Sequence, residues 1–329
     1  MPALGAGGRR FESCLPDHQK NSMFKSGSNR VYTREEVSNG ESIIRVEGTS
    51  RAENHAFITL SRHFRTKSLP VPSILSVSAD EMSYTQTDLG DTLLFDYIES
   101  GRTSGHYSIE EIRMLELTIR ALAHIQIEGA VGLDWSVCYP VPCFDHRSIM
   151  WDLNYFKYDY LKLTGIEIDE VRLEDEFDRM ACALLAVPCT TFMYRDFQSR
   201  NVMIHDDKPY FIDYQGGRKG PIYYDIASFL WQAKANYPQA LREQLIEVYM
   251  DEAEKLKYPI SRGDFRKTLE LFVLFRSLQV LGAYGFRGLY ERKQHFIDSI
   301  PLALQNIRTL FAQNKTLQTN YPYISNVVC

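Results

Sequence analysis

The residues between positions 193 and 217 include the side chains best suited to chemistry. Asp196 and Asn201 stand in the pattern Asp-x-x-x-x-Asn, and a second aspartate, Asp213, follows farther along. Phosphoryl transfer needs such a group, because one carboxylate must orient the attacking hydroxyl and accept its proton. Mg²⁺ prefers hard oxygen ligands and usually takes only one or two from protein carboxylates, leaving the others to water and phosphate. We therefore expect Asp196 to be the catalytic base, and Asn201 and Asp213 to be metal ligands.

Two short apolar runs predict how these side chains come together. The runs NVMI and YFID flank the segment HDDKP, whose acidic pair and proline suit a turn. A hairpin there places Asp196 and Asn201 on the loop before one strand, and Asp213 at the end of the other. The alternative is that the aspartates are turn residues and Asn201 is a cap. An isolated Asp-x-x-x-x-Asn is common, whereas the complete ordered series is much more specific and favours catalysis.

The same stretch resembles known kinases. RDFQSRN resembles R-D-x-x-x-x-N, the kinase catalytic loop, and IDYQG stands where kinases have D-F-G. No A-P-E-like segment follows, and Asp225-Ile-Ala resembles the D-[IL]-A motif of aminoglycoside and choline kinases. In that family this aspartate supports the catalytic loop through hydrogen bonds, which the resemblance implies for Asp225. The resemblance also implies a bilobal, protein-kinase-like α+β fold, with a small β-rich N-lobe and a larger, mainly helical C-lobe. It further implies an enzyme that uses ATP and Mg²⁺.

A polar segment before the first expected strand is the candidate for contacting the phosphates of ATP. A glycine lets the backbone approach phosphate closely, and successive N–H groups can surround an anion. The alternative is an ordinary flexible lead-in. The segment consists of Ser26, Gly27, Ser28, Asn29 and Arg30.

The small lobe departs from the kinase pattern in one respect. Glu53 opens a helix where kinases place the glutamate that pairs with a lysine, although an acidic residue there also suits the helix dipole. The lysine itself is missing from the run ESIIRVEG, in which Arg45 is the nearest basic residue. We expect Arg30 or Arg34 to supply the phosphate contact instead.

The segment QTDLGD resembles the hinge between the lobes of kinases, whose backbone pairs with adenine. The alternative is an ordinary turn after a strand. The nucleotide-binding candidates in this segment are Asp88, Leu89 and Gly90.

The elements on either side of the hinge differ in kind. Before it, VYTREEV and ESIIRVEG flank Ser38-Asn39-Gly40, a strong hairpin signal. One helical face and two further strand-like runs complete a small sheet with one helix. After it, helical patterns dominate, beginning with a Ser-x-x-Glu capping box at Ser108. We expect a leader that is disordered or artefactual at residues 1–22, an N-lobe that is either complete or incomplete at 23–91, a C-lobe at 92–315 and a tail at 316–329.

The bulk composition limits the classes of function. The chain has 329 residues, 44% of them hydrophobic, and a formal net charge of −5, which disfavours nucleic acid as a partner. Six scattered cysteines form no zinc-ligand pattern and suit reduced thiols. No run of 18 apolar residues and no signal-like N-terminus is present, so we expect a cytoplasmic enzyme without a membrane partner.

Within the broad family, residues 24 to 315 resemble the bacterial anomeric kinases of N-acetylmuramate and N-acetylglucosamine. The segments that carry the resemblance are GSNR, TDLGD, YRDFQSRN, IDYQG and LQVLGAYGFRG. The resemblance implies an amino-sugar acceptor, for which Asp152 and Asn154 are candidate contacts, although an amphipathic core helix explains them equally well. The alternatives are an aminoglycoside or choline kinase, a catalytically silent nucleotide-binding regulator, and a protein kinase.

Overall fold

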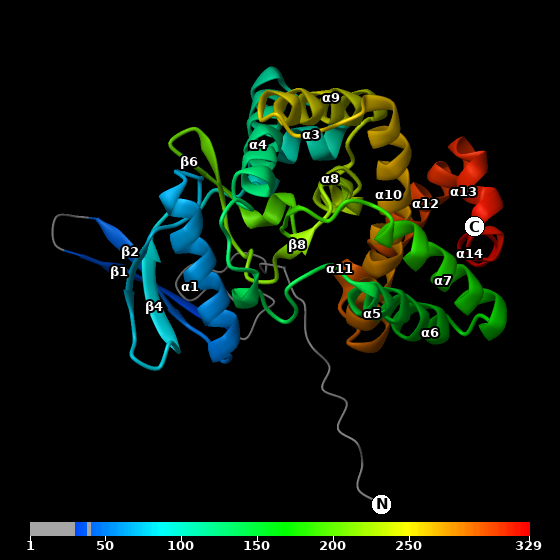
Figure 1. Ribbon diagram of the computed structural model, residues 1–329, viewed down its shortest axis with the longest axis horizontal. Helices are drawn as coiled ribbons and strands as arrows, with labels where there is room; N and C mark the ends of the chain where they lie inside the picture. The colour runs from blue at the N-terminus through cyan, green and yellow to red at the C-terminus, as the bar shows by residue number, and fades with distance from the viewer. Residues whose placement is uncertain (1–29, 38–40) are drawn as a thin grey trace, which may run out of the picture.

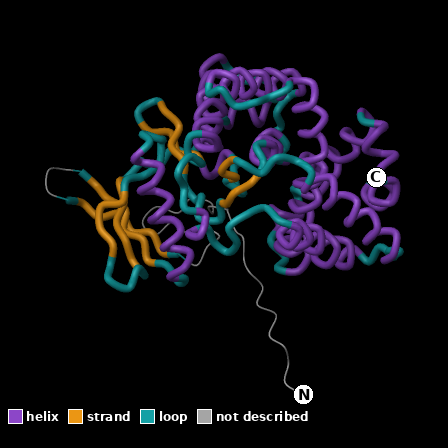
Figure 2. Tube along the Cα trace, viewed as in Figure 1, coloured by secondary structure: helices purple, strands orange, loops and turns teal. Residues whose placement is uncertain are grey.

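The structure is a computed structural model that describes residues 30–37 and 41–329 (Figures 1 and 2). Three of our expectations fall outside these residues. They are the leader at 1–22, the phosphate-contacting residues Ser26, Gly27, Ser28 and Asn29, and the hairpin turn at Ser38-Asn39-Gly40.

The N-lobe is a four-stranded antiparallel sheet with one helix beside it, as expected (Figure 1). The sheet order is β1-β2-β4-β3. Ser50 caps helix α1 by accepting a hydrogen bond from the Glu53 amide, and the apolar face of α1 packs into the core through Phe57, Leu60 and Phe64. The elements of this lobe are β1 (Val31–Glu36), β2 (Ser42–Glu47), α1 (Arg51–Thr66), β3 (Ile74–Val77) and β4 (Ser83–Thr87).

The C-lobe is mainly helical, as the purple tubes of Figure 2 show. The expected capping box at Ser108 is present: its hydroxyl accepts from the Glu111 amide, and the Glu111 carboxylate accepts from the Ser108 amide. The helices up to the catalytic loop are α2 (Leu94–Tyr97), α3 (Glu99–Ser104), α4 (Ile109–Ile127), the 3₁₀ turn Trp135–Val137, α5 (His146–Phe156), the π-helical turn Lys157–Leu161, α6 (Lys162–Thr164) and α7 (Glu170–Leu185). Those that follow it are α8 (Tyr223–Leu230), the 3₁₀ turn Ala233–Ala235, α9 (Gln239–Lys255), α10 (Arg262–Tyr284), the π-helical turn Gly285–Tyr290, α11 (Gln294–Ile297), α12 (Ile300–Gln313), α13 (Lys315–Asn320) and α14 (Pro322–Val328).

Helix α10 is the central helix of this lobe. It packs on α5, α8 and α12, and glycines permit its close approach to α5: a Cβ on Gly282 would lie 2.7 Å from the Tyr155 carbonyl carbon. Among the described residues, the segment Arg262–Tyr290 is long and apolar enough to cross a membrane, but 67% of its apolar window is buried inside the protein. The segment therefore has the character of a core helix.

Short strands flank the segments that contain the candidate catalytic residues. β6 (Val202–His205) and β7 (Lys208–Phe211) form the expected antiparallel hairpin, while β5 (Thr191–Met193) pairs with β8 (Arg218–Gly220). A short turn, Ser199–Asn201, leads into β6. This arrangement places the loop before β6 and the residue after β7 at the same end of the hairpin.

The residues that we set apart as a tail are helical and packed. Helices α13 and α14 follow α12, and Tyr323, Ile324 and Val328 of α14 are buried. The Glu176 carboxylate on α7 accepts hydrogen bonds from the first amides of α14, at Tyr323 and Ile324. These contacts integrate the last helix into the C-lobe.

Candidate active site

Asp225 lies beneath the loop that carries Asp196. Its buried carboxylate accepts hydrogen bonds from the backbone amides of Tyr194 (2.8 Å) and Arg195 (3.0 Å), and from the side chain of Gln126 (2.7 Å). Burial raises the pKa of Asp225 to about 7, although the three donors act in the opposite direction. This geometry supports the positioning role that we expect for Asp225, because its two oxygens fix the backbone immediately before Asp196.

The residue before Asp196 has an unusual backbone conformation. Arg195 has a φ of 81°, in the left-handed region that disfavours residues with a side chain. Its guanidinium donates two hydrogen bonds to the Asp152 carboxylate, at 2.6 and 2.9 Å, and both side chains are buried. This two-pronged ion pair attaches Arg195 to Asp152 of α5. The side chain of the next residue, Asp196, remains one-quarter exposed.

Of the two candidate acceptor contacts, Asp152 and Asn154, the structure gives Asp152 another partner. Asp152 has both carboxylate oxygens bound to Arg195, an arrangement that favours a positioning role over direct contact with an acceptor. Asn154 lies on the same helix and is half-buried. Direct contact of either residue with an acceptor stays a prediction.

Asn201 and Asp213 are the expected metal ligands. The Asn201 side chain donates to the Asp196 backbone carbonyl at 2.7 Å, which leaves its amide oxygen for another partner. Asp213 has a φ of 66° and accepts a hydrogen bond from Gln215 at 2.7 Å. Burial, with a smaller contribution from the Asp196 charge, raises the pKa of Asp213 to about 6, against the effect of Arg30. Compared with an exposed aspartate, the charged form of Asp213 is therefore disfavoured, and a positive charge beside it would stabilise that form.

Arg30 occupies the place of the missing lysine. Its guanidinium lies 3.1 Å from the Glu53 carboxylate and 4.0 Å from Asp213, and it is almost fully buried. The neighbour of Arg45, Ile44, faces the cleft, and successive residues of a strand point to opposite faces. Arg45 therefore lies on the other face of the sheet, where it pairs with Glu35. Of the alternatives that we considered, Arg30 is therefore the residue that meets Glu53 and Asp213.

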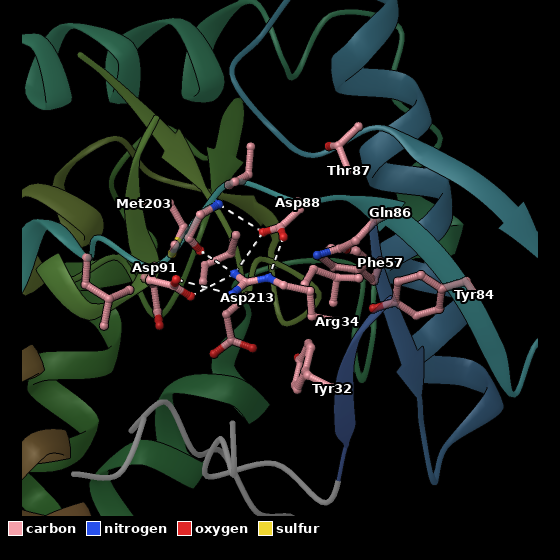
Figure 3. Close-up of a pocket in the computed structure, with 16 residues that line it drawn as sticks. Tyr32, Arg34, Phe57, Tyr84, Gln86, Thr87, Asp88, Asp91, Met203 and Asp213 are labelled. Atoms are coloured by element: carbon pink, nitrogen blue, oxygen red, sulfur yellow. Dashed lines mark hydrogen bonds and ion pairs between the residues drawn. The ribbon is translucent and has the colours of Figure 1, made fainter. Parts of the chain in front are cut away.

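Arg34 holds the hinge segment together (Figure 3). Its guanidinium donates to Asp88 at 2.5 Å and to Asp91 at 2.7 Å, and reaches the Gly90 carbonyl at 3.3 Å. Asp88 also accepts from the Gly90 amide and from Ser42. Burial alone would raise the pKa of Asp88, but the bonds from Arg34, Ser42 and the Gly90 amide outweigh it and lower that pKa. The structure thus associates Arg34 with the hinge.

A cleft between the sheet and the C-lobe brings the hinge and the metal candidates together (Figure 3). It encloses about 900 Å³ of space, part of which is open to solvent. Apolar side chains from both lobes line it together with polar ones, among them Gln86 and the metal candidates Asn201 and Asp213: the apolar residues are Ile44, Leu89, Leu93, Met203 and Ile212. A largely apolar slot with a few polar groups suits a nucleotide.

Two buried arginines near Asp196 were missed by the sequence analysis. Arg276 on α10 lies 3.7 Å from an Asp196 oxygen and donates to Ser228. Arg218 on β8 is buried and donates to the Gly216 carbonyl; burial, followed by the charge of Arg195, lowers its pKa to about 10. The signal for Arg276 was a cation inside the apolar run FVLFRSLQV.

Comparisons with known proteins agree with the kinase-like fold. The model of the phosphotransferase enzyme family matches residues 24–259. The chain is 24% identical to the N-acetylmuramate/N-acetylglucosamine kinase of Neisseria meningitidis, over 91% of this chain and 87% of that protein. It is 22% identical to the enzyme of the same name from Pseudomonas aeruginosa, over 75% and 70%. Among solved structures, Plasmodium vivax ethanolamine kinase is similar in fold, with a TM-score of 0.60, 13% identity, and coverage of 84% of this chain and 78% of that one.

Proposed function

The chain belongs to the phosphotransferase enzyme family, and from that premise we propose that it transfers a phosphoryl group from ATP to the anomeric hydroxyl of an N-acetylated amino sugar. The observation that carries the proposal is that Asn201 and Asp213 line a cleft between two lobes, while the Asn201 side chain bonds the backbone carbonyl of Asp196. The acceptor is proposed from the names of the two bacterial relatives. We also propose that the enzyme acts in the cytoplasm.

Asp196 is the proposed base. Its carboxylate is partly exposed, so an acceptor hydroxyl can reach it and transfer its proton as the phosphoryl group moves. An anomeric hydroxyl is more acidic than an ordinary alcohol, so modest basicity is sufficient. Most of the rate enhancement then comes from positioning, which Asp225 and the Arg195–Asp152 pair provide.

Asn201, Asp213 and the neighbouring Arg30 fit a nucleotide with a divalent cation. Asn201 and Asp213 offer the hard oxygen atoms that Mg²⁺ prefers. No cluster of three or more His, Cys, Asp or Glu side chains that could hold a metal occurs in the described part of the chain, as expected if the phosphates complete the coordination. When bound, the cation would neutralise charge on the phosphates. Arg30, held by Glu53, supplies a second positive charge beside Asp213.

The charges around Asp196 favour a neutral or anionic acceptor. Arg276 and Arg218 both act on Asp196, whereas the charge of Arg195 is balanced by Asp152. A polycationic aminoglycoside or a choline-like cation would meet like charge here, which argues against those alternatives. N-acetylmuramate carries a carboxylate and N-acetylglucosamine is neutral, so both suit these surroundings.

A catalytically silent regulator is the alternative of another class, and the missing lysine suggested it. The contact of Arg30 with Glu53 weakens this alternative, because the pair of charges that the lysine would form is present in another form. The complete set of Asp196, Asn201 and Asp213 argues in the same direction.

The test is ADP release with ATP and Mg²⁺ across N-acetylmuramate, N-acetylglucosamine, kanamycin and choline. We expect turnover with an N-acetyl sugar, lost in Asp196→Asn. Asp207→Asn, in the exposed turn of the same hairpin, is the matched control and should behave as the unaltered protein. Turnover with kanamycin or choline alone would contradict the proposed acceptor, and ATP binding without any turnover would support the regulator.

A further inference from the structure

A glutamine in the nucleotide cleft has a side-chain carbonyl without a partner. Gln86 lies on β4, is only 7% exposed and lines the cleft. No described group donates a hydrogen bond to its Oε1 atom. Leaving a buried polar atom unpaired destabilises a protein, so such an atom at the wall of a cleft points to a ligand.

The sheet register fixes the direction of this side chain. Gln86 pairs with Ile44 across β2 and β4, and both line the cleft, whereas Thr85 faces the other side of the sheet and contacts Ser76. Figure 3 shows Gln86 pointing from its strand into the cleft, beside Arg34. Arg34 itself is bound to the hinge carboxylates, so the Gln86 amide is a polar group there that remains available to a base.

The surroundings of Gln86 suit the edge of a flat ring. Ile44 comes from the sheet above the cleft, and Leu93 and Met203 come from the C-lobe. A purine held between these apolar side chains, with its edge along the hinge after β4, brings the substituent on its C6 atom toward Gln86.

We propose that the Gln86 amide hydrogen-bonds this edge of the purine and allows the site to accept both adenosine and guanosine triphosphates. Adenine has an amino donor at C6, and guanine has a carbonyl acceptor there. A primary amide carries both a donor and an acceptor, and rotation about its last side-chain bond exchanges them. The inference rests on the proposed function only in taking the cleft to be a nucleotide site.

The experiment is calorimetric titration of the full chain with ATP and with GTP in the presence of Mg²⁺ and without an acceptor. For the unaltered protein we expect dissociation constants within about tenfold of each other, because either base can form the bond. In Gln86→Met the constant for GTP should rise about tenfold, since the guanine carbonyl loses its donor. The constant for ATP should rise less, because we expect the hinge backbone to pair with adenine as well.

Thermal unfolding and a control variant separate this effect from damage to the fold. Gln86→Met should unfold at no lower a temperature than the unaltered protein, because it removes an unpaired carbonyl. Thr85→Val, on the other face of the strand, should change neither dissociation constant by more than about twofold.

Two results would overturn the inference alone: GTP binding more than about a hundredfold weaker than ATP, or unchanged constants in Gln86→Met. Failure to bind either nucleotide would overturn the proposed function as well. Nucleotide binding without turnover on any acceptor would contradict only the proposed function.

Discussion

Replacing Asp152 by alanine should cost the protein both stability and turnover. The change leaves the Arg195 guanidinium buried without the carboxylate that accepts its bonds at 2.6 and 2.9 Å. Removing one partner of a buried ion pair destabilises a protein by about 3–5 kcal/mol. Turnover should fall by about tenfold or more, because the pair also holds the left-handed backbone of Arg195 next to Asp196.

Urea unfolding and steady-state kinetics measure the two effects. The double variant Asp152→Leu with Arg195→Met should lose less stability than Asp152→Ala, because neither charge is left unpaired. The single variant Arg195→Lys should be less active than the unaltered protein, since an ammonium group cannot form the two-pronged contact with Asp152. The KM for ATP should change little in Asp152→Ala, because Asp152 does not line the nucleotide cleft.

A direct role of Asp152 in acceptor binding predicts a different pattern. The KM for the acceptor would then rise in Asp152→Ala, while the free energy of unfolding would change by less than about 1 kcal/mol. That pattern, or a double variant that is no more stable than Asp152→Ala, would refute the positioning role.

Three further predictions concern the charged groups of the cleft. Arg30→Met should lower kcat/KM for ATP by about a hundredfold, because Arg30 is the cation beside Glu53. Arg45→Met is the control and should leave kcat/KM within about twofold of the unaltered protein. Equal values for the two variants in steady-state kinetics would contradict the prediction. Asp213 has a folded pKa of about 6, above its ordinary value, so the ligand-free fold binds a proton that the unfolded chain has lost. Its contribution to stability should therefore fall as pH rises from about 4 to about 6, and urea unfolding of Asp213→Asn, which lacks this titration, should show a shallower decline. Arg276→Met should raise kcat/KM for a cationic acceptor relative to a neutral sugar by several-fold, and an unchanged ratio in competition assays would show that Arg276 does not set this preference.

The placement of the candidate catalytic residues around one hairpin could be predicted because it is local. The apolar runs on either side of HDDKP form β6 and β7, and a hairpin of that length necessarily places the loop before it and the residue after it at the same end. The N-lobe sheet followed from the same kind of signal, strand alternation joined to turn residues. The positions of residues within a few places of a strand or helix are determined by that strand or helix, so a local sequence pattern is enough to predict them.

The pairing of the charged residues could not be predicted, because it depends on how distant elements pack. Arg30 lies before β1, yet it meets Glu53 on α1 and Asp213 after β7. Asp152 was equally consistent with a sugar contact and with an amphipathic core helix, until the packing of α5 placed it against Arg195. The sequence predicted a helical block that includes α10 but gave no indication that Arg276 within it lies near Asp196.

The measurement that tests the account most directly is phosphorus NMR of the products formed from N-acetylmuramate, ATP and Mg²⁺. The account predicts a new signal of a sugar phosphate coupled to the anomeric proton, which Asp207→Asn retains and Asp196→Asn abolishes. ADP formation without a sugar phosphate, or an equal signal with Asp196→Asn, would contradict the assignment of Asp196 as the base of a sugar kinase.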